Sequence, residues 1–289
     1  MVRTPIPRLF ALIGDPVAGN PTQEVVEDAF RRMGLDWRYI SARVSPEALA
    51  PAVDGLRALG FHGAHVTVPH KVAVVRLVDV LSPAARAIGA VNCIVADDGV
   101  LRGENTDGVG LVAAVTRMKP VEGAHVLLFG AGGAARAIAV ELAMAGAHDI
   151  RVANRDPKRR DHLVRAVEAI GGTVRGVSWP DRRIDIDGAT IVVNATTIGM
   201  QAGTAGDAAV PVAWETARPG LIAADVVIER STRFTAEAVA AGAIAIGGIE
   251  MLVEQAARSI ELWTGRDPDR EPLRRVLDAE LTPPGGDRR

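Results

Sequence analysis

The chain has 289 residues, 48% of them hydrophobic, which suffices for two domains of roughly 100–200 residues with separate cores. Its 33 Lys and Arg balance 35 Asp and Glu without any run of like charge, and this excludes the basic surfaces that bind nucleic acids or anionic membranes. The single cysteine, Cys93, excludes an internal disulfide. No apolar run approaches the ~20 residues of a membrane-spanning helix, and residues 1–8 make a poor signal peptide, so we expect a cytoplasmic protein.

Helices and strands alternate in the first third of the chain. Leu9–Ile13 is a short apolar run that ends in a turn, and the segment from Asn20 to Gly34 has the apolar spacing of a helix. The elements expected next are a strand at 37–42, a helix at 46–59, a strand at 63–68, a helical turn at 82–88, a strand at 91–96 and a hairpin-type turn at 97–99. This alternation is typical of an α/β domain with a parallel sheet. A polar loop at 103–110 then leads into a helix near Val109.

A second α/β unit begins with a strand at 124–129, a glycine loop at 130–133 and a helix at 134–145. It continues with a strand at 149–153, a helix at 157–170 and strands at 190–194 and 221–227. The period predicts a doubly wound Rossmann domain, which binds a dinucleotide. A final helix at 249–263 follows, and periodicity alone leaves open which of the two units it packs against.

The glycine loop is the strongest local signal in the sequence. It reads Gly-x-Gly-x-x-Ala and joins a buried strand to a helix. Gly130 permits the tight turn, Gly132 lets the backbone approach a pyrophosphate, and the small Ala135 lets the helix pack closely on the strand. The free N–H groups at the start of the helix favour phosphate oxygens. A glycine-rich turn without a ligand is the plain alternative.

The end of the next strand selects the cofactor. An NAD site usually has an acid there for the ribose hydroxyls, whereas this chain has Asn154 and Arg155, with Arg159 one helical turn further on. Arg155 can face the adenine and pair with a 2′-phosphate, which favours NADP. Asp156 keeps NAD open, because its carboxylate could repel that phosphate or hold the ribose. The basic strand end also disfavours a methyl-donor cofactor.

Two polar stretches of the first unit, at 64–71 and 103–108, carry groups that a structural loop does not need. Oxidation of a secondary alcohol requires a base for the hydroxyl proton while a hydride leaves the same carbon. A lysine whose pKa is lowered by burial, or one held by a carboxylate, can serve as that base. Lys71 is the candidate base and Asp107 is its candidate partner.

Several motifs occur together, in order and at matching spacing, over nearly the whole chain. They are Gly63–Lys71, Val91-Asn92, Asn105–Gly108, Gly130–Ala134, Asn154-Arg155, Asn194–Met200 and Gly247–Ala257. In these motifs the sequence closely resembles the shikimate dehydrogenase family.

The resemblance implies reversible, NADP-linked reduction of 3-dehydroshikimate to shikimate, a step of aromatic amino acid biosynthesis. It implies Lys71 and Asp107 as the catalytic pair. The substrate-binding residues implied are Asn20, Thr22, Thr67, Asn92 and Gln255. The cofactor-binding residues implied are Gly130, Ala131, Gly132, Gly133, Ala134, Asn154, Arg155, Thr196 and Met200.

The resemblance also implies a division into domains. Residues 1–108 and 249–289 are expected to form the substrate-binding catalytic domain, and residues 109–248 the NADP-binding Rossmann domain. The C-terminal helix is expected to return to the first domain, with the substrate between the two domains. A small cyclic hydroxy acid is the expected partner, and the sequence leaves a homodimer open.

The sequence departs from the family at the substrate carboxylate. The family has two serines after its first strand where this chain has Asn20 and Thr22, and an asparagine where it has His65. The tyrosine expected after Val227 is Ile228. Each lost donor can cost about 1–3 kcal/mol where a substrate group stays unpaired. Quinate, an aminated analogue or a related cyclic hydroxy acid therefore remains open as the substrate.

Plainer interpretations exist for each site residue. Lys71 could be a surface lysine, Asn92 a strand-end amide, and Asp107 the N-cap of the helix that follows it. Asn20 and Thr22 could cap their own helix. Three histidines, at positions 62, 65 and 70, lack an acid or cysteine at ligand spacing, so we expect no metal. A sensor of the same fold that binds NADP without turnover is the alternative of another class.

Overall fold

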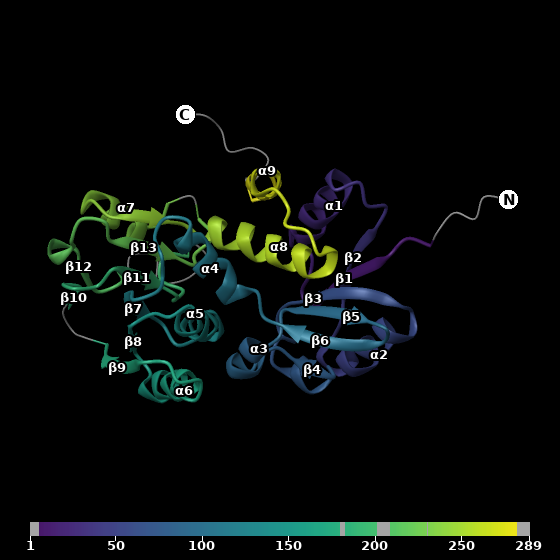
Figure 1. The fold of residues 1–289 in the computed structure, drawn as a ribbon, viewed down its shortest axis with the longest axis horizontal. Helices are drawn as coiled ribbons and strands as arrows, with labels where there is room; N and C mark the ends of the chain where they lie inside the picture. Colours follow the sequence, from purple (N-terminus) through teal and green to yellow (C-terminus); the bar gives the residue numbers. More distant parts are fainter. Residues whose placement is uncertain (1–5, 180–182, 201–208, 230, 282–289) are drawn as a thin grey trace. The chain divides into compact units, whose positions relative to one another are not determined.

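The computed structural model describes residues 6–179, 183–200, 209–229 and 231–281. Residues 1–5, which belong to the N-terminal segment predicted to be a poor signal peptide, lie outside these ranges. The chain forms two compact units, Met1–Thr106 with Ala256–Arg289 and Asp107–Gln255 (Figure 1). Helix α8, Gly248–Thr264, therefore begins in the second unit and ends in the first. No helix of the described residues is both long and apolar enough to cross a membrane.

The first unit contains a six-stranded sheet in the order β2-β1-β3-β5-β6-β4. Its strands are β1 Leu9–Gly14, β2 Arg38–Arg43, β3 Phe61–Val66, β4 Val80–Leu81, β5 Cys93–Asp97 and β6 Val100–Glu104. Strands β2, β1 and β3 are parallel, whereas β5 runs antiparallel to both β3 and β6. The sheet is thus mixed rather than wholly parallel. The chain reverses between β5 and β6 because Asp98 and Gly99 adopt φ values of 45° and 81°, a two-residue hairpin turn.

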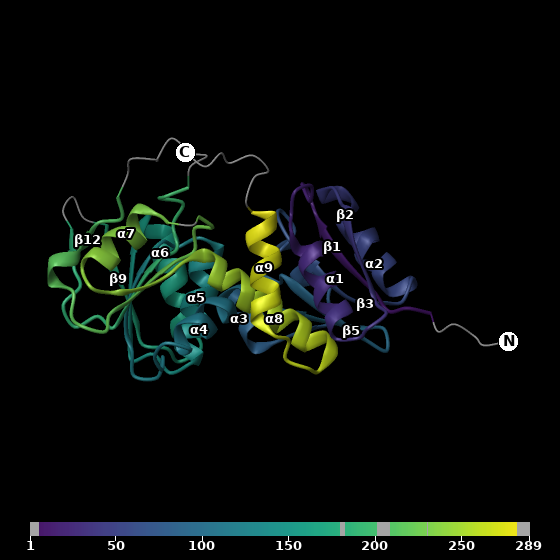
Figure 2. The same ribbon diagram turned by 90° about the horizontal axis from the view of Figure 1, so that it is seen from above.

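Helices of the first unit pack on this sheet and on one another. They are α1 Thr22–Arg32, α2 Leu49–Ala58, α3 Pro83–Ile88, the end of α8, and α9 Arg270–Glu280. Helix α9 packs beside α1 (Figure 2). Helix α9 was not predicted from the sequence, and its Leu273 and Leu277 are buried among mostly polar neighbours.

The end of α8 belongs to the core of the first unit. Trp263 packs against Phe10 and Tyr39, and its indole Nε1 donates to the Ile94 carbonyl of β5 at 2.9 Å. This contact confirms the prediction that the C-terminal helix at 249–263 returns to the first unit. Gly63 is required opposite this indole, because a Cβ there would lie 2.4 Å from Trp263 Nε1.

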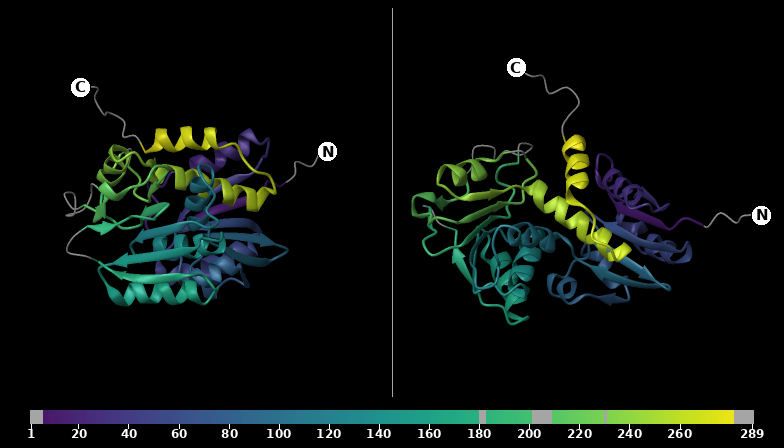
Figure 3. Two further views of the ribbon diagram at one scale, coloured as in Figure 1. Left: turned by 60° about the vertical axis from the view of Figure 1, so that its left-hand side comes forward. Right: turned by 45° about the horizontal axis from the view of Figure 1, so that its top comes forward.

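The second unit contains a six-stranded sheet in which every neighbouring pair is parallel. Its strands, which can be followed in Figure 3, are β7 His125–Phe129, β8 Asp149–Asn154, β9 Val174–Ser178, β11 Ile191–Asn194, β13 Ile222–Asp225 and β14 Ile244–Ile246. The order β9-β8-β7-β11-β13-β14 is the 3-2-1-4-5-6 order of a Rossmann fold. Its direction of winding changes between β7 and β11, where such folds bind their ligands.

The described part of the second unit also contains the helices α4 Asp107–Thr116, α5 Gly133–Met144, α6 Pro157–Glu168 and α7 Arg233–Ala240, and the start of α8. Leu127 and Phe129 of β7 pack with Phe234 of α7 in one buried cluster. Alternate β7 residues, such as Leu128, point to the opposite face of the sheet and are equally buried. Both faces of the sheet are therefore covered, which leaves the strand ends for function.

Candidate active site

The glycine loop lies at the carboxyl end of β7. Gly130 has φ = +113°, and a Cβ there would lie 2.5 Å from the Ala195 carbonyl oxygen, so only glycine fits. A Cβ at Gly132 or Gly133 would meet no heavy atom within 4 Å. The backbone is thus exposed to open space where α5 begins, the arrangement that lets phosphate oxygens reach helix N–H groups.

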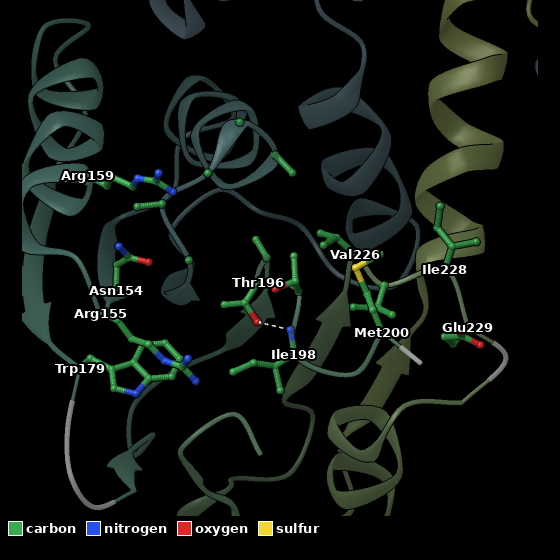
Figure 4. A pocket seen from close by; sticks show the side chains of 18 residues that line it. Asn154, Arg155, Arg159, Trp179, Thr196, Ile198, Met200, Val226, Ile228 and Glu229 are labelled. Carbon is green, nitrogen blue, oxygen red and sulfur yellow. Dashed lines mark hydrogen bonds between the residues drawn. The ribbon is translucent and has the colours of Figure 1, made fainter. Parts of the chain in front are cut away.

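A pocket of about 510 Å³ opens over this loop (Figure 4). Its walls follow the carboxyl ends of β7, β8, β9, β11 and β13, and so include both sides of the point where the winding changes. It brings together all nine residues that the sequence assigned to the cofactor. The lining residues are Gly130–Ala134, Asn154, Arg155, Arg159, Trp179, Ala195–Ile198, Met200 and Val226–Glu229.

Asn194 shapes the wall that follows β11. Its Oδ1 accepts from the backbone N–H and the hydroxyl of Thr196 at 3.1 and 2.7 Å. The Thr196 hydroxyl in turn accepts from the Ile198 N–H at 3.1 Å, the dashed line of Figure 4. Thr196 is therefore fixed as a turn residue at the pocket wall, and Met200, which is half exposed, follows on the same loop.

Asp225 is buried directly beside Asn194, at the end of β13. Its carboxylate accepts from Asn194 Nδ2 at 2.9 Å, the Val227 N–H at 3.0 Å and the Thr232 hydroxyl at 2.6 Å. Burial raises the pKa of Asp225, although these three hydrogen bonds favour the ionised form. The carboxylate holds the start of the loop that contains Val226 and Ile228.

The end of β8 settles the position of Asp156. Its carboxylate caps α6, accepting from the backbone N–H groups of Lys158 and Arg159 at 2.8 and 3.3 Å. Asn154 Nδ2 donates to the Asp156 carbonyl at 2.9 Å. Among the described residues, those that line the pocket include Arg155 and Arg159 but not Asp156. The acid is thus engaged with a helix start, while the two guanidinium groups face the pocket.

Trp179 is a pocket residue that the sequence analysis missed. The Arg155 guanidinium lies over its indole, 5.0 Å from the ring centroid, and Figure 4 shows the two side by side. Trp179 also meets Phe129 edge to face, with 5.8 Å between ring centroids. A tryptophan just past a strand end was the available signal, but β9 is an edge strand with exposed polar residues and was not predicted.

These features fit a dinucleotide. Open backbone at a helix start suits a pyrophosphate, an apolar wall with an Arg155–Trp179 pair suits an adenine, and the cationic strand end suits further negative charge. The sequence-predicted cofactor site is thus one contiguous surface within the second unit.

In the first unit, the turn that contains Lys71 is held at several points. Thr67 N–H donates to the Ile13 carbonyl at 3.0 Å, and its own carbonyl accepts from His70 N–H at 2.9 Å. The buried His70 ring donates from Nε2 to the Val44 carbonyl at 2.7 Å. The Lys71 carbonyl accepts from Val91 N–H at 2.8 Å. Thr67 and Lys71 are therefore set on one rigid turn beside the end of β3, and both are partly buried.

Asn92 is joined to the segment that leads to Asp107. Asn92 Oδ1 accepts from Thr106 N–H at 2.7 Å, and its Nδ2 donates to the Thr106 hydroxyl at 3.1 Å, all of it buried. The Thr106 hydroxyl also bonds with that of Ser259 at 3.2 Å. Asp107 comes next and is the first residue of α4, two residues before the expected helix start. Lys71 belongs to the first unit, and Asp107 and Gln255 belong to the second.

Asn20 and Thr22 form a closed local turn before α1. Asn20 Oδ1 accepts from both the backbone N–H and the hydroxyl of Thr22, at 3.0 and 2.5 Å. The Thr22 hydroxyl proton is therefore used within the turn. What remains of the pair is the Asn20 NH₂ donor and the acceptor lone pairs of Thr22 Oγ1.

His65 occupies the position where the family has asparagine. Its Nδ1 lies 2.7 Å from the Tyr39 hydroxyl. Its ring meets the Trp263 ring edge to face, with 4.7 Å between the ring centroids. Tyr39 is fully buried, and burial raises its pKa well above the usual value. His65 and His70 thus both have structural partners. Among the described residues, no group of three or more His, Cys, Asp or Glu is placed to hold a metal ion.

Cys93 is buried in β5 among apolar side chains. Burial raises the pKa of its thiol to about 12. The residue therefore has the small, buried strand position expected from the sequence.

Comparison with known proteins covers most of the chain. The model of the shikimate dehydrogenase substrate binding domain matches residues 12–94, that of shikimate/quinate 5-dehydrogenase matches 113–199, and that of the shikimate 5′-dehydrogenase C-terminal domain matches 248–277. A shikimate dehydrogenase (NADP(+)) from Rubrobacter xylanophilus is 42% identical over 94% of this chain and 96% of its own. The chain belongs to the shikimate dehydrogenase family.

Solved structures resemble this chain over nearly its whole length. A shikimate 5-dehydrogenase from Thermus thermophilus, in complex with NADP(H) and shikimate, is 33% identical with a TM-score of 0.81 over 95% of this chain and 100% of that one. A ligand-free 5-ketofructose reductase from a Gluconobacter strain is 37% identical with a TM-score of 0.90 over 95% and 99%. Proteins of this fold are thus named for more than one substrate.

Proposed function

We propose that this protein catalyses the NADP-dependent, reversible oxidation of shikimate to 3-dehydroshikimate. The observation that carries the proposal is the likeness, over nearly the whole chain, to relatives named as NADP-dependent shikimate dehydrogenases. The lysine and the aspartate that the chemistry needs, Lys71 and Asp107, are both present at the motif positions.

The reaction divides into a proton transfer and a hydride transfer. When bound, NADP supplies the acceptor for the hydride that leaves the alcohol carbon. Lys71, with its amine neutral, takes the hydroxyl proton at Nζ, and its ammonium form returns a proton to the carbonyl oxygen in the reverse direction. The Asp107 carboxylate stabilises and orients that ammonium. Thr67, Asn92 and Gln255 are the proposed partners of the ring hydroxyls.

The cofactor assignment is supported by the pocket of the second unit. The loop Gly130–Ala134 would hold the pyrophosphate on its N–H groups, and Thr196 and Met200 would line the nicotinamide end. Asn154 and Arg155 would hold the adenosine end, where the carboxylate of Asp156 is engaged in capping α6. An NADP-linked reductase with one buried cysteine suits the cytoplasm, where we propose that it works.

A second candidate substrate is a neutral polyhydroxy ketone. The turn of Asn20 and Thr22 retains one NH₂ donor and an acceptor oxygen, which matches a hydroxyl group better than a carboxylate, because a carboxylate only accepts. The likeness to a 5-ketofructose reductase favours the same class. The bond changes at the reacting carbon are identical in both candidates.

The deciding experiment follows the absorbance of reduced nicotinamide with shikimate, quinate and, in the reductive direction, 5-ketofructose, each with the NADP and the NAD couple. Efficient turnover of shikimate with NADP, and far weaker turnover of 5-ketofructose, supports the first candidate. The opposite ranking supports the second. Absence of turnover with all three, in protein that binds NADP, would refute both and favour a non-catalytic sensor.

A further inference from the structure

A second pocket, of about 430 Å³, lies on the other side of the glycine loop, at the N-terminal ends of α5 and α6. It shares Ala131–Gly133 and Arg159 with the first pocket. The remaining lining residues are Arg136, Lys158, His162 and Leu163. Three of its side chains are permanently or normally cationic, and among the described residues none that line it is acidic. The composition is that of a site for a compact anion.

Arg136 distinguishes this pocket from an ordinary solvated basic surface. It lies one turn into α5 and is partly buried, and burial lowers the pKa of its guanidinium. Its Nε is buried and has no hydrogen-bond partner among the described residues. A buried donor without an acceptor is costly, so the geometry calls for an acceptor at this position.

His162 orients that guanidinium. Arg136 Nη1 lies 3.2 Å from His162 Nε2, and since a guanidinium only donates, Nε2 is the acceptor of this hydrogen bond. The imidazole thus holds the guanidinium through a hydrogen bond rather than an ion pair with a carboxylate. Asp156 caps α6 through the Lys158 N–H and lies 3.6 Å from Arg159, and its side chain does not line this pocket.

We propose that Arg136, oriented by His162, completes the site for the 2′-phosphate of NADP from the α5 side, and so determines the preference for NADP over NAD. This inference rests on the proposed NADP-linked function. Arg159 lines both pockets and connects the adenosine end of the first to the cation pair of the second. A phosphate dianion there would accept from Arg136 and Arg159 and from the N-terminal N–H groups of α5.

The test measures binding rather than turnover, by isothermal titration calorimetry with 2′,5′-ADP and 5′-AMP, which differ only in the 2′-phosphate. Arg136→Met should weaken 2′,5′-ADP about tenfold or more, because a charge-assisted hydrogen bond is lost, and leave 5′-AMP within about twofold. Arg136→Lys should retain part of the affinity. His162→Leu should weaken 2′,5′-ADP by a smaller factor. Arg165→Met, on an exposed part of α6 that lines neither pocket, is the matched control.

Two results would overturn the inference. One is an Arg136→Met variant that binds both nucleotides as the wild type does, or loses both equally. The other is a pair of results in which orthophosphate binds the wild type but not Arg136→Met, while 2′,5′-ADP binds both proteins equally. These results would assign the pocket to a free anion instead of the 2′-phosphate. If the Arg136→Met variant does not fold, His162→Leu still tests the inference, because His162 is exposed and its substitution should not disturb folding. If the wild type binds NADP in preference to NAD but does not turn over shikimate, the proposed substrate is refuted. The inference about Arg136 is then unaffected.

Discussion

Asn194 Nδ2 donates to Asp225 Oδ1 at 2.9 Å, and the two residues sit opposite each other at the ends of neighbouring parallel strands. The loop after each strand forms a wall of the cofactor pocket, 195–200 on one side and 226–229 on the other. Neither residue lines the pocket itself. A buried amide–carboxylate pair thus shapes a binding surface from behind, through the backbone and hydroxyl groups that it holds.

The raised pKa of Asp225 predicts a specific pH dependence of stability. A carboxyl group with a raised folded-state pKa contributes stability that is complete below its unfolded pKa, near 3.8, and is lost as pH rises through the folded-state pKa. Asp225→Asn removes this titration. The free energy of unfolding of the variant, relative to wild type, should therefore rise between pH 4 and the folded-state pKa and be constant above it. Urea unfolding of both proteins across that range measures the difference.

The control is Asp187→Asn, since Asp187 is exposed and pairs with Arg218 at the surface. Its unfolding curves give the baseline for replacing a surface carboxyl group with an amide. A pH-independent difference between wild type and Asp225→Asn would contradict the raised pKa.

The glycine loop offers a matched pair of substitutions. Gly130→Ala should destabilise the protein by about 1–3 kcal/mol from backbone strain, with a further cost from the contact with the Ala195 carbonyl. Gly132→Ala should fold normally, because φ is −81° and no atom lies within 4 Å of the new methyl group. It should nevertheless weaken NADP binding, since the methyl occupies the space left for the pyrophosphate. Thermal denaturation and NADP titration separate the two effects, and equal melting temperatures would contradict the argument.

The cofactor loop was predictable because its signal is local. The strand, Gly130, Gly132 and the helix follow one another within a short stretch, and each residue type is explained by its own backbone position. Asn154 and Arg155 were found in the same way, as the end of the next strand. The Rossmann strand order then brought these segments together without further information.

Residues contributed by tertiary packing were not predictable. Trp179 follows an exposed edge strand, and Arg136 matters only because α5 and α6 lie side by side and His162 faces it. Asp156 was ambiguous in the sequence, because capping a helix and holding a ribose use the same carboxylate. Helix α9 was missed because only a narrow stripe of it, around Leu273 and Leu277, is apolar.

The catalytic assignment predicts that Lys71→Ala separates chemistry from cofactor binding. General acid–base groups contribute about 10²–10⁴-fold, so kcat should fall by that factor. The NADP dissociation constant should stay within about twofold, because the described residues that line the cofactor pocket all belong to the second unit and Lys71 belongs to the first. Stopped-flow turnover and equilibrium NADP titration of the same preparation give both quantities. Arg86→Ala, an exposed cation of the first unit, should change neither. A large loss of NADP affinity in Lys71→Ala would show that the residue has another role.

Substitutions in the turn before α1 should change the substrate preference. In the double variant Asn20→Ser, Thr22→Ser, no amide oxygen remains to accept the hydroxyl proton of residue 22, so two hydroxyl donors become available for a carboxylate. The ratio of kcat/KM for shikimate to that for a neutral polyhydroxy ketone should rise about tenfold, as expected for a gained hydrogen bond to a charged group. Thr22→Val in the wild type leaves Asn20 in place and should lower activity on hydroxyl-rich substrates. If the double variant changes kcat/KM equally for both substrates, this turn does not determine substrate preference. The preference must then be set by His65 and Ile228.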